Sequence, residues 1–221
     1  MELLAAPVLA SQIFADAKSL KFSECDACSF VIVKLDDIKN EGVYESILTR
    51  EQLRLPQQKF VSKALARLAL GRLLRVEPST LRFHANENGK PFLSAEPRLS
   101  FNVSHSQTLW VMAASFERSV GVDLETIKSW ERLEKIAARV FSPDENRLLS
   151  EIASEPLRVQ TALAMWTSKE ALVKLEGNGL FEGLAEFSFS LNPTRCLQRP
   201  GVDFKHFTGK ADFVMTLASS S

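Results

Sequence analysis

The pattern of apolar and polar positions runs through the same succession of elements in each half of the chain. Residues 59–74 and 157–175 have the periodicity of helices. Strand-like stretches follow the first helix at 81–84 and 101–103, and the second helix at 186–191. This mixture of helices and short strands predicts a fold of the α+β class.

The two halves also resemble each other in sequence. Residues 110–115 (WVMAAS) are similar to 213–218 (FVMTLA), and residues 48–53 are similar to 141–146. We therefore expect two similar α+β lobes related by a pseudo-two-fold axis, with the active site in the cleft between them. The expected lobes cover residues 1–119 and 120–221.

Local signals indicate where several helices begin and end. Thr49 and Ser142 are suited to cap helices that start just after them, and Pro143 suits a first helical position. The Gly-Asn-Gly sequence at 177–179 is expected to end the second long helix.

Two carboxylates stand two residues apart in an apolar stretch. Residues 110–116 and 120–125 are expected to form a hairpin through 117–119, and its second strand carries Asp123 and Glu125. Side chains two apart in a strand leave on the same face. The pair suits Mg²⁺, which prefers oxygen ligands, although a solvated strand edge would show the same pattern.

The second long helix carries a further carboxylate and two lysines. Glu170 and Lys174 are four residues apart and share one helix face, and Lys169 precedes them. Each residue alone is more typical of a solvated surface. Together with the two strand carboxylates, they could hold a divalent cation and a phosphate, which points to chemistry on a phosphorylated substrate.

The first half offers further candidate groups for an anion. Lys90 lies in an Asn-Gly-Lys-Pro turn, which either presents its charge to a phosphate or is simply solvated. Asn102, Ser104 and His105 share a short polar segment that could be a capped turn or a cradle for a phosphate or an adenine.

A basic stripe lies on the first long helix. Lys59, Lys63 and Arg67 are spaced four residues apart and lie on one helix face, a pattern that is usually a solvated surface. The adjacent apolar set, residues 60, 64 and 68, is expected to face the core.

Composition limits the range of functions. The 221 residues have a formal net charge of zero, so no broad attraction to nucleic acid or membrane is indicated. No apolar stretch is long enough to span a membrane, and the first residues lack the basic flank of a signal peptide. Cys25 and Cys28 have metal-like or redox-like spacing, but no second ligand pair matches them and Cys196 stands alone. Reduced thiols in a cytoplasmic protein are favoured.

Several common sites are not indicated. The chain has no G-x-x-x-x-G-K-S/T loop, no G-x-G-x-x-G fingerprint and no G-x-S-x-G elbow. The common nucleotide-binding folds and a serine nucleophile are therefore disfavoured.

Taken together, the motifs resemble those of the two-lobed 4′-phosphopantetheinyl transferases. They occur in that family's order and spacing over roughly residues 59 to 190. The matching motifs are NGKP at 88–91, FNVSHS at 101–106, GVDLE at 121–125, FS-x-x-E at 141–145 and WTSKEA-x-x-K at 166–174, followed by Gly177 and Gly179.

The resemblance implies transfer of the phosphopantetheine arm of coenzyme A to a serine of an apo acyl or peptidyl carrier protein, with release of adenosine 3′,5′-bisphosphate. Asp123, Glu125 and Glu170 would bind Mg²⁺, and Lys174, with Lys169, would neutralise the pyrophosphate. The residues implied around the nucleotide and its 3′-phosphate are Arg67, Lys90, Asn102, Ser104 and His105.

Some points stay open. The base that takes the serine proton is either Glu170 or Glu145. Because the segment from residue 50 to 59 looks shortened relative to the family, Arg54, Lys59 and Lys63 are only candidates for phosphate contacts. Two other functions are considered: a non-catalytic coenzyme-A- or carrier-binding homologue, and a Mg²⁺-dependent hydrolase of nucleotide diphosphates. A two-lobed chain is expected to be a monomer.

Overall fold

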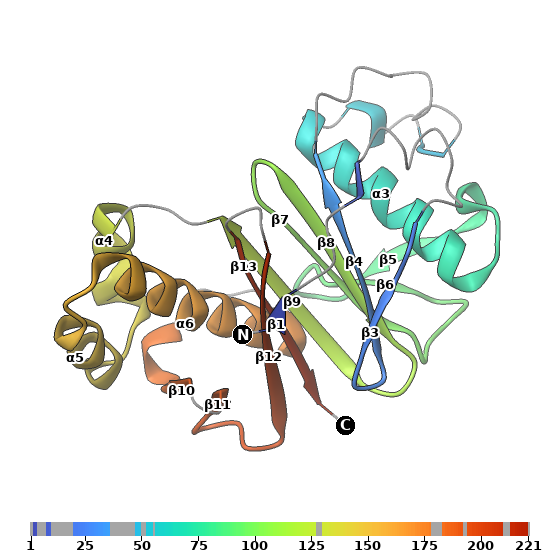
Figure 1. The fold of residues 1–221 in the computed structure, drawn as a ribbon. Helices are drawn as coiled ribbons and strands as arrows, with labels where there is room; N and C mark the ends of the chain where they lie inside the picture. Colours follow the sequence, from blue (N-terminus) through green and yellow to red (C-terminus); the bar gives the residue numbers. More distant parts are fainter. Residues whose placement is uncertain are drawn as a thin grey trace.

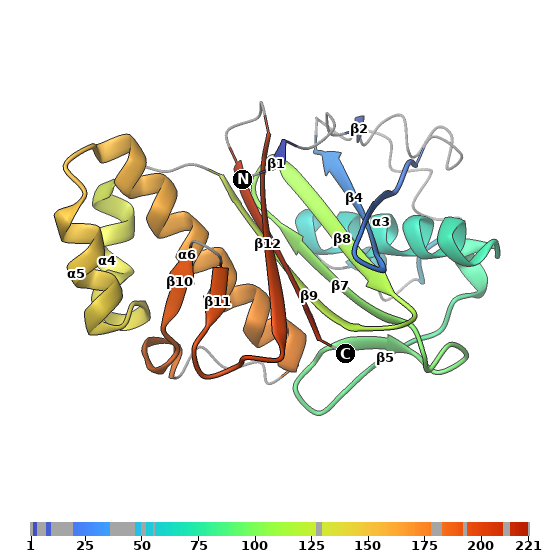
Figure 2. The same cartoon turned by 60° about the horizontal axis from the view of Figure 1, so that its bottom comes forward.

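The computed structural model has two sheets in its middle, with one long helix on the outer side of each (Figure 1). The shorter helices α4 and α5 gather beyond the far end of α6, and the same layers are visible after rotation (Figure 2). None of the described helices is long and apolar enough to cross a membrane. The residues that the structure describes are 2–3, 8–9, 20–35, 47–49, 52–54, 56–126, 130–177, 183–191, 194–209 and 213–220.

The first sheet is built from strands of the first half. Strand β8 lies between β4 and β7 and is antiparallel to both, β2 runs parallel to β4, and β3 forms a hairpin with β4. The bounds are β2 (Val8–Leu9), β3 (Ser23–Cys25), β4 (Cys28–Lys34), β7 (Ser100–His105) and β8 (Leu109–Ser115).

The second sheet has the order β1-β12-β13-β9. Its last three strands are antiparallel, whereas β1 runs parallel to β12. The bounds are β1 (Glu2–Leu3), β9 (Ser119–Thr126), β12 (Val202–Gly209) and β13 (Phe213–Ser220). Strand β1 therefore lies in the sheet of the second half, across the expected lobe boundary.

The remaining elements are helices and two small hairpins. The α-helices are α3 (Gln57–Leu74), α4 (Trp130–Val140), α5 (Pro143–Glu151) and α6 (Glu155–Glu176). The 3-10 turns are η2 (Gln52–Arg54), η3 (Pro78–Thr80) and η4 (Leu184–Glu186). The hairpins are β5 (Phe83–Ala85) with β6 (Pro91–Leu93), and β10 (Phe189–Leu191) with β11 (Thr194–Cys196).

The predicted mixture of helices and strands is confirmed, and the two long helices are α3 and α6. Ser142 caps α5 in a reciprocal box with Glu145, and Gly177 ends α6 in the left-handed conformation, as predicted. Thr49 also forms a reciprocal pair, with Gln52, but this pair caps the turn η2, and α3 begins later, at Gln57.

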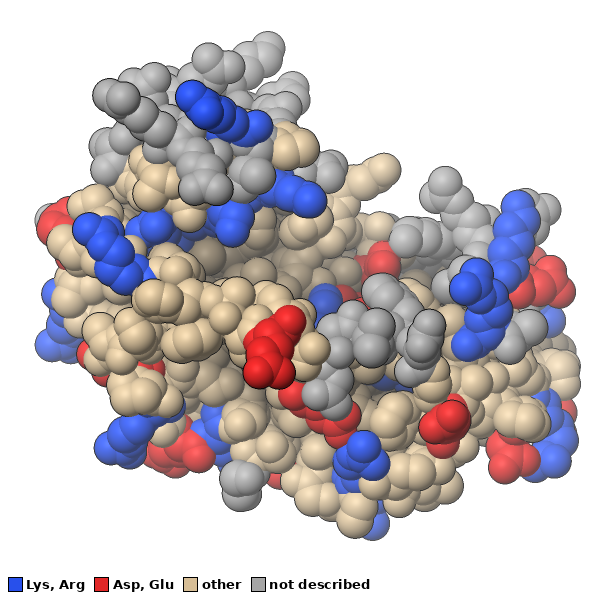
Figure 3. Space-filling view, turned by 180° about the vertical axis from the view of Figure 1, so that it is seen from behind, with Lys and Arg blue, Asp and Glu red and all other residues tan. Residues whose placement is uncertain are grey.

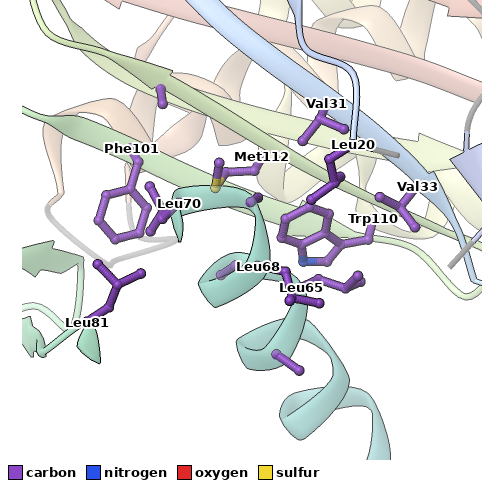
Figure 4. Close-up of a cluster of buried hydrophobic side chains, with 14 of the residues drawn as sticks. Leu20, Val31, Val33, Leu65, Leu68, Leu70, Leu81, Phe101, Trp110 and Met112 are labelled. Carbon is purple, nitrogen blue, oxygen red and sulfur yellow. The ribbon is translucent and has the colours of Figure 1, made fainter. Parts of the chain in front are cut away.

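The central strands are apolar on both faces because each sheet is covered on both sides. In β8, Trp110 and Met112 face α3, whereas Val111 and Ala113 face the second sheet. Figure 4 shows the first of these clusters, in which the Trp110 indole lies beside Leu65 of α3. The order of layers is therefore α3, first sheet, second sheet and α6.

The predicted hairpin between β8 and β9 is wrong. The two strands are joined by residues 116–118 but belong to different sheets: β8 pairs with β4 and β7, and β9 pairs with β13. Where β9 runs along β7, its Val120 and Val122 amides donate to Ser100 Oγ and Asn102 Oδ1 of β7 (3.0 and 3.1 Å). Where the two sheets meet, backbone amides of β9 therefore bond to side chains of β7 and not to its backbone.

A polar layer lies between α6 and the second sheet. Thr167 and Thr216 hydroxyls are 2.7 Å apart, and Ser168 Oγ lies 2.8 Å from His206 Nε2. Ser168 Oγ donates its hydrogen to Ala164 O (2.6 Å) and can therefore only accept from His206. We therefore assign His206 as neutral, with the proton on Nε2, which donates to Ser168 Oγ. Burial lowers the pKa of His206 to about 4.

This histidine is expected to make the protein sensitive to acid. Its folded pKa lies below the ordinary value of 6.5, so the unfolded chain takes up the proton first as the pH falls. The stability contribution is complete above pH 6.5 and is lost as the pH falls towards about 4. Between about pH 7 and about pH 5 the loss should be ~2 kcal/mol. In urea unfolding, the change in stability from about pH 7 to about pH 5 should be more favourable for His206→Gln than for the wild type by ~2 kcal/mol. An equal change in stability in wild type and His206→Gln would contradict the assignment.

Candidate active site

The candidate site forms where β9 passes α6. Along β9, Val120, Val122 and Leu124 point into the core between the sheets. The alternate positions, which include Asp123 and Glu125, therefore face α6, and the predicted sharing of one face is confirmed.

Asp123 is held by two partners. Its Oδ1 accepts hydrogen bonds from Ser104 Oγ of β7 (2.8 Å) and Lys174 Nζ of α6 (2.6 Å). Lys174 Nζ also donates to Ser104 Oγ (3.0 Å), which closes a triangle between three elements. The Asp123 side chain is 7% exposed and that of Lys174 is 27% exposed, so the Lys174 side chain is partly open to solvent.

Glu170 lies one helical turn before Lys174 and is 8% exposed. Burial, together with the negative charges of Asp123 and Glu125, raises its pKa to about 7, although Lys174 opposes this shift. Glu170 Oε1 and Asp123 Oδ2 are both buried and have no hydrogen-bond partner. Burying two negatively charged carboxylates near each other, each with an oxygen that lacks a hydrogen bond, costs free energy. A bound cation or a proton on one of the carboxylates would remove this cost.

This donor set fits a hard divalent cation. Carboxylate oxygens are the ligands that Mg²⁺ prefers, and Mg²⁺ usually keeps waters and substrate oxygens in the rest of its shell. Among the described residues, no three histidine, cysteine or acidic side chains form a ready-made metal cluster. The predicted set Asp123, Glu125 and Glu170 is thus not preassembled, and Asp123 and Glu170 carry the bare oxygens.

Gly121 allows α6 to come this close to β9. A Cβ atom at this position would lie 2.1 Å from Ala171 O and 2.4 Å from Leu175 N, both in the backbone of α6. The absence of a side chain therefore sets the spacing at which Glu170 and Lys174 reach Asp123.

A cavity of about 420 Å³ lies on the first half of the molecule. One wall is α3 and the others come from the β5–β6 hairpin and β7. Figure 3 shows this face, with a hollow near its centre, lysine and arginine side chains gathered on the side of α3, and charged atoms of both signs deeper in. The lining residues are Gln52, Lys59, Ser62, Lys63, Ala66, Arg67, Phe83, His84, Ala85, Gly89, Pro91, Phe101, Val103 and His105.

The basic stripe of α3 faces this cavity. Lys59 and Lys63 are exposed, as the sequence pattern favoured, whereas Arg67 is buried, and all three line the wall. The expected apolar neighbours are confirmed as part of the core, with Ala64 and Leu68 buried. Arg54, the other candidate, is exposed and is not among the described lining residues.

The Arg67 side chain is held by contacts within the protein. Its Nη1 donates to Leu81 O (2.8 Å) and Pro78 O (3.2 Å), and its guanidinium lies over the ring of Phe83 at 4.9 Å. Burial lowers its pKa, but the group keeps its charge. Its Nε is buried without a hydrogen-bond partner, so one donor remains unused.

Three other residues expected at the nucleotide are engaged elsewhere. Asn102 and Ser104 contact β9, as described above, and Lys90 Nζ donates to Val120 O (3.1 Å) and Leu175 O (2.8 Å). None of the three is among the described residues that line the cavity, whereas His105 is.

Glu145 and Lys169 form a separate buried cluster. Glu145 Oε2 accepts from Ser142 N (2.7 Å) and contacts Lys169 Nζ (2.9 Å), and its Oε1 accepts from Phe189 N (2.9 Å). Lys169 Nζ also donates to Leu184 O (2.8 Å) and to Phe187 O, and its side chain is fully buried. The cluster fastens α5, α6 and η4 to each other and is not joined to Asp123 or Glu170 by any hydrogen bond or ion pair among those described.

The Cys25 and Cys28 spacing has a structural explanation. The two cysteines are register partners on either side of the β3–β4 turn. The residues between them, Asp26 and Ala27, have φ angles of 45° and 61°, as a two-residue hairpin turn of this hand requires.

The helical period of α3 could also have predicted two further residues that line the cavity. Ser62 and Ala66 follow Lys59 and Lys63 by three residues, so they lie on the same face of α3 and also line the cavity. The contribution of Phe83 and His84 depends on the fold of the β5–β6 hairpin and has no comparable signal in the sequence.

Two family models match the chain in succession. Residues 119–218 match the 4′-phosphopantetheinyl transferase superfamily, and residues 50–117 match a 4′-phosphopantetheinyl transferase N-terminal model. The two matches meet next to the start of β9.

Individual relatives carry the same description. The 4′-phosphopantetheinyl transferase HetI of a Nostoc species is 38% identical over 135 residues, which are 60% of this chain and 56% of that protein. The 4′-phosphopantetheinyl transferase psf-1 of Bacillus pumilus is 30% identical over 164 residues, 72% of this chain and 68% of that protein. Sfp of Bacillus subtilis is 34% identical over 130 residues, 58% of this chain and 55% of that protein. The chain thus spans little more than half the length of two of these relatives.

Proposed function

Since the chain belongs to the 4′-phosphopantetheinyl transferase superfamily, we propose that it transfers the phosphopantetheine arm of coenzyme A to a serine of an apo carrier protein. Adenosine 3′,5′-bisphosphate would be the second product. The observation that carries the proposal is the meeting of Asp123, Glu170 and Lys174, which brings the acidic strand motif and the helix motif together beside a basic cavity.

We assign Mg²⁺ binding to Asp123 and Glu170, with Glu125 on the same face of β9. When bound, Mg²⁺ would neutralise charge on the pyrophosphate of coenzyme A. The ammonium group of the partly exposed Lys174 would bind a pyrophosphate oxygen, and its bond to Asp123 holds it in place. Phosphoryl transfer depends mainly on such positioning and charge neutralisation.

We assign the proton transfer to Glu170 rather than to Glu145. Glu170 Oε1 has no hydrogen-bond partner within the protein, so this oxygen is available to accept a proton. Both oxygens of Glu145, by contrast, are already engaged by backbone amides and Lys169.

We infer that the nucleotide end of coenzyme A binds in the cavity beside α3. Lys59, Lys63 and Arg67 supply positive charge on one wall, and His105 lies at the end of β7. The volume of about 420 Å³ is within the usual range for a small-molecule site.

The proposal also includes the arrangement of the whole chain. Each half has one sheet and one long outer helix, which supports two related lobes divided near residue 119 and a site between them. The meeting of the two family models at that position supports the same division. We further propose a cytoplasmic monomer that acts on coenzyme A and a carrier protein, and not on nucleic acid.

The release of adenosine 3′,5′-bisphosphate distinguishes this function from the two alternatives. The protein is incubated with coenzyme A and Mg²⁺, with and without an apo carrier protein, and the nucleotide is measured by chromatography. A transferase releases it only when the carrier is present. A hydrolase releases it without the carrier, and a binding module does not release it at all; either result would overturn the proposal.

The basic wall of the cavity predicts a specific defect. Lys63→Met should raise the KM for coenzyme A about tenfold or more, because a charge-assisted bond to the 3′-phosphate is lost. With dephospho-coenzyme A, which lacks that phosphate, Lys63→Met and wild type should have similar KM values. The exposed Arg72 on the same helix provides the control, since Arg72→Met should change neither value. An equal defect with both substrates would contradict the proposed site of the 3′-phosphate.

A further inference from the structure

Lys90 lies between two residues that line the cavity, Gly89 and Pro91, and its side chain contacts the two elements that carry the candidate catalytic groups. We propose that Lys90 is a positioning residue, which holds β9 and α6 in the register that brings Asp123 to Glu170 and Lys174. This inference rests on the proposed function and assigns Lys90 a role other than direct contact with the nucleotide.

The contacts of the Lys90 ammonium reach both elements of the site. Nζ donates to Val120 O on β9, three residues before Asp123. It also donates to Leu175 O on α6, the residue directly after Lys174. One side chain from the first half therefore bonds to the two elements that carry the carboxylates and the lysine.

The bond to Leu175 O also provides a hydrogen-bond donor for a carbonyl group in the last turn of α6. The last four carbonyl groups of an α-helix have no partner within the helix, and the C-terminus carries partial negative charge. Gly177 N donates to Val173 O, and Lys90 supplies a donor and a nearby positive charge to Leu175 O. Burial lowers the pKa of Lys90 to about 8, in line with a side chain enclosed between the two halves.

The turn that presents Lys90 is itself well fixed. Asn86 Oδ1 accepts from the Asn88 and Lys90 amides (3.0 and 2.8 Å), and Asn86 N donates to Lys90 O (3.0 Å). Gly89 occupies the turn with φ at 84°, which favours glycine. The anchor on the first half is therefore stiff.

The turn also packs directly on the end of α6. A Cβ atom at Gly177 would lie 3.1 Å from both Asn86 Nδ2 and Lys90 Cδ. The same hairpin supplies His84, Ala85, Gly89 and Pro91 to the cavity. The hairpin therefore lines the cavity and also contacts the last turn of α6.

Steady-state kinetics of Lys90→Met tests this role. Methionine is similar in length and apolar volume but has no donor for either carbonyl. We expect kcat to fall about 10- to 100-fold, because small displacements of reacting groups have effects of this size, while the KM for coenzyme A changes less than about threefold. Lys90→Arg, which keeps donors, should recover most of kcat. The exposed lysine control, Lys21→Met, should match the wild type.

The opposite pattern would overturn the proposal. A Lys90→Met variant with a KM for coenzyme A raised about tenfold and an unchanged kcat would show a nucleotide ligand, and a variant equal to wild type would show no role. If Lys90→Met does not fold, Lys90→Gln, whose amide group is uncharged and lies on a stem too short to reach both carbonyl groups as Lys90 does, takes its place with the same outcomes.

Hydrogen exchange provides a second readout that needs no turnover. The amides in the last turn of α6 should exchange faster in Lys90→Met than in wild type, whereas those of the α5 capping box should not change. If wild type fails to modify any carrier, the proposed function fails, but this exchange pattern still decides whether Lys90 holds α6. Unchanged exchange at the end of α6 would contradict the positioning role.

Discussion

Glu170→Gln is expected to stop transfer and at the same time to stabilise the metal-free protein. The variant has no carboxylate for Mg²⁺ or for the serine proton, so transfer should fall by about 10²–10⁴-fold. The stabilising effect follows from burial, because the charged Glu170 carboxylate lies near Asp123 and Glu125 with one oxygen unpartnered.

The pH dependence of this effect has a definite sign. Burial raises the folded pKa of Glu170 from 4.5 to about 7, so above pH 7 folding opposes ionisation of this group. The metal-free wild type should therefore gain stability from this group as the pH falls from above 7 towards 4.5. The glutamine side chain of the variant is neutral at every pH, so at about pH 8 Glu170→Gln should be more stable than the wild type by ~1–3 kcal/mol.

Urea unfolding at about pH 8 with a chelator measures the stability of the metal-free proteins, and urea unfolding with Mg²⁺ measures how much the metal stabilises each of them. Mg²⁺ should stabilise the wild type, because it binds only the folded state, and should have little effect on Glu170→Gln. The exposed Glu151→Gln serves as control and should change neither transfer nor stability. Transfer near the wild-type rate would refute the role of Glu170, and a less stable variant would contradict the burial argument.

Gly121→Ala is expected to destabilise the protein by ~3 kcal/mol or more. The added methyl group would meet two backbone atoms of α6 at 2.1 and 2.4 Å, so the helix or the strand must move. The φ angle of Gly121 is not in the left-handed region, so the effect comes from lack of space alone. Any displacement of α6 also moves Glu170 and Lys174 away from Asp123, and transfer should fall with stability.

Gly201→Ala is the matched control for this change. A Cβ atom at Gly201 has nothing within 4 Å, and this glycine also lacks a positive φ. Its stability should stay within about 0.5 kcal/mol of wild type. If thermal or urea unfolding gives Gly121→Ala the same stability as Gly201→Ala, the close approach of β9 and α6 is not required.

The features that the sequence predicted correctly depend on neighbours close in the chain. The period of two along β9 places Asp123 and Glu125 on the α6 face, and the start of α5 follows from Ser142 and Pro143 alone. The helical spacing of Glu170 and Lys174 likewise needs only the period of α6.

The features that it did not predict depend on distant contacts. Lys90 is a cation in an exposed-looking turn, and its partner Leu175 is 85 residues away in the chain. Lys169 likewise bonds to a carbonyl group of η4 and to the carboxylate of Glu145 in α5. The local sequence around residues 116–118 correctly indicates two strands and a turn, and we therefore predicted a hairpin. Which strands pair is decided by how both faces of each strand are buried, and the local sequence does not show this.

The intact mass of an apo carrier protein tests the proposed transfer most directly. The chain is incubated with coenzyme A, Mg²⁺ and apo carriers from fatty-acid, polyketide and peptide synthases, and each carrier is analysed by mass spectrometry with mapping of the modified residue. We predict that at least one carrier gains the mass of a single phosphopantetheine arm on one serine, and that the same carrier stays unmodified with Glu170→Gln or with a chelator. Unchanged masses for every carrier, while coenzyme A still binds the wild-type protein, would contradict the proposed transfer.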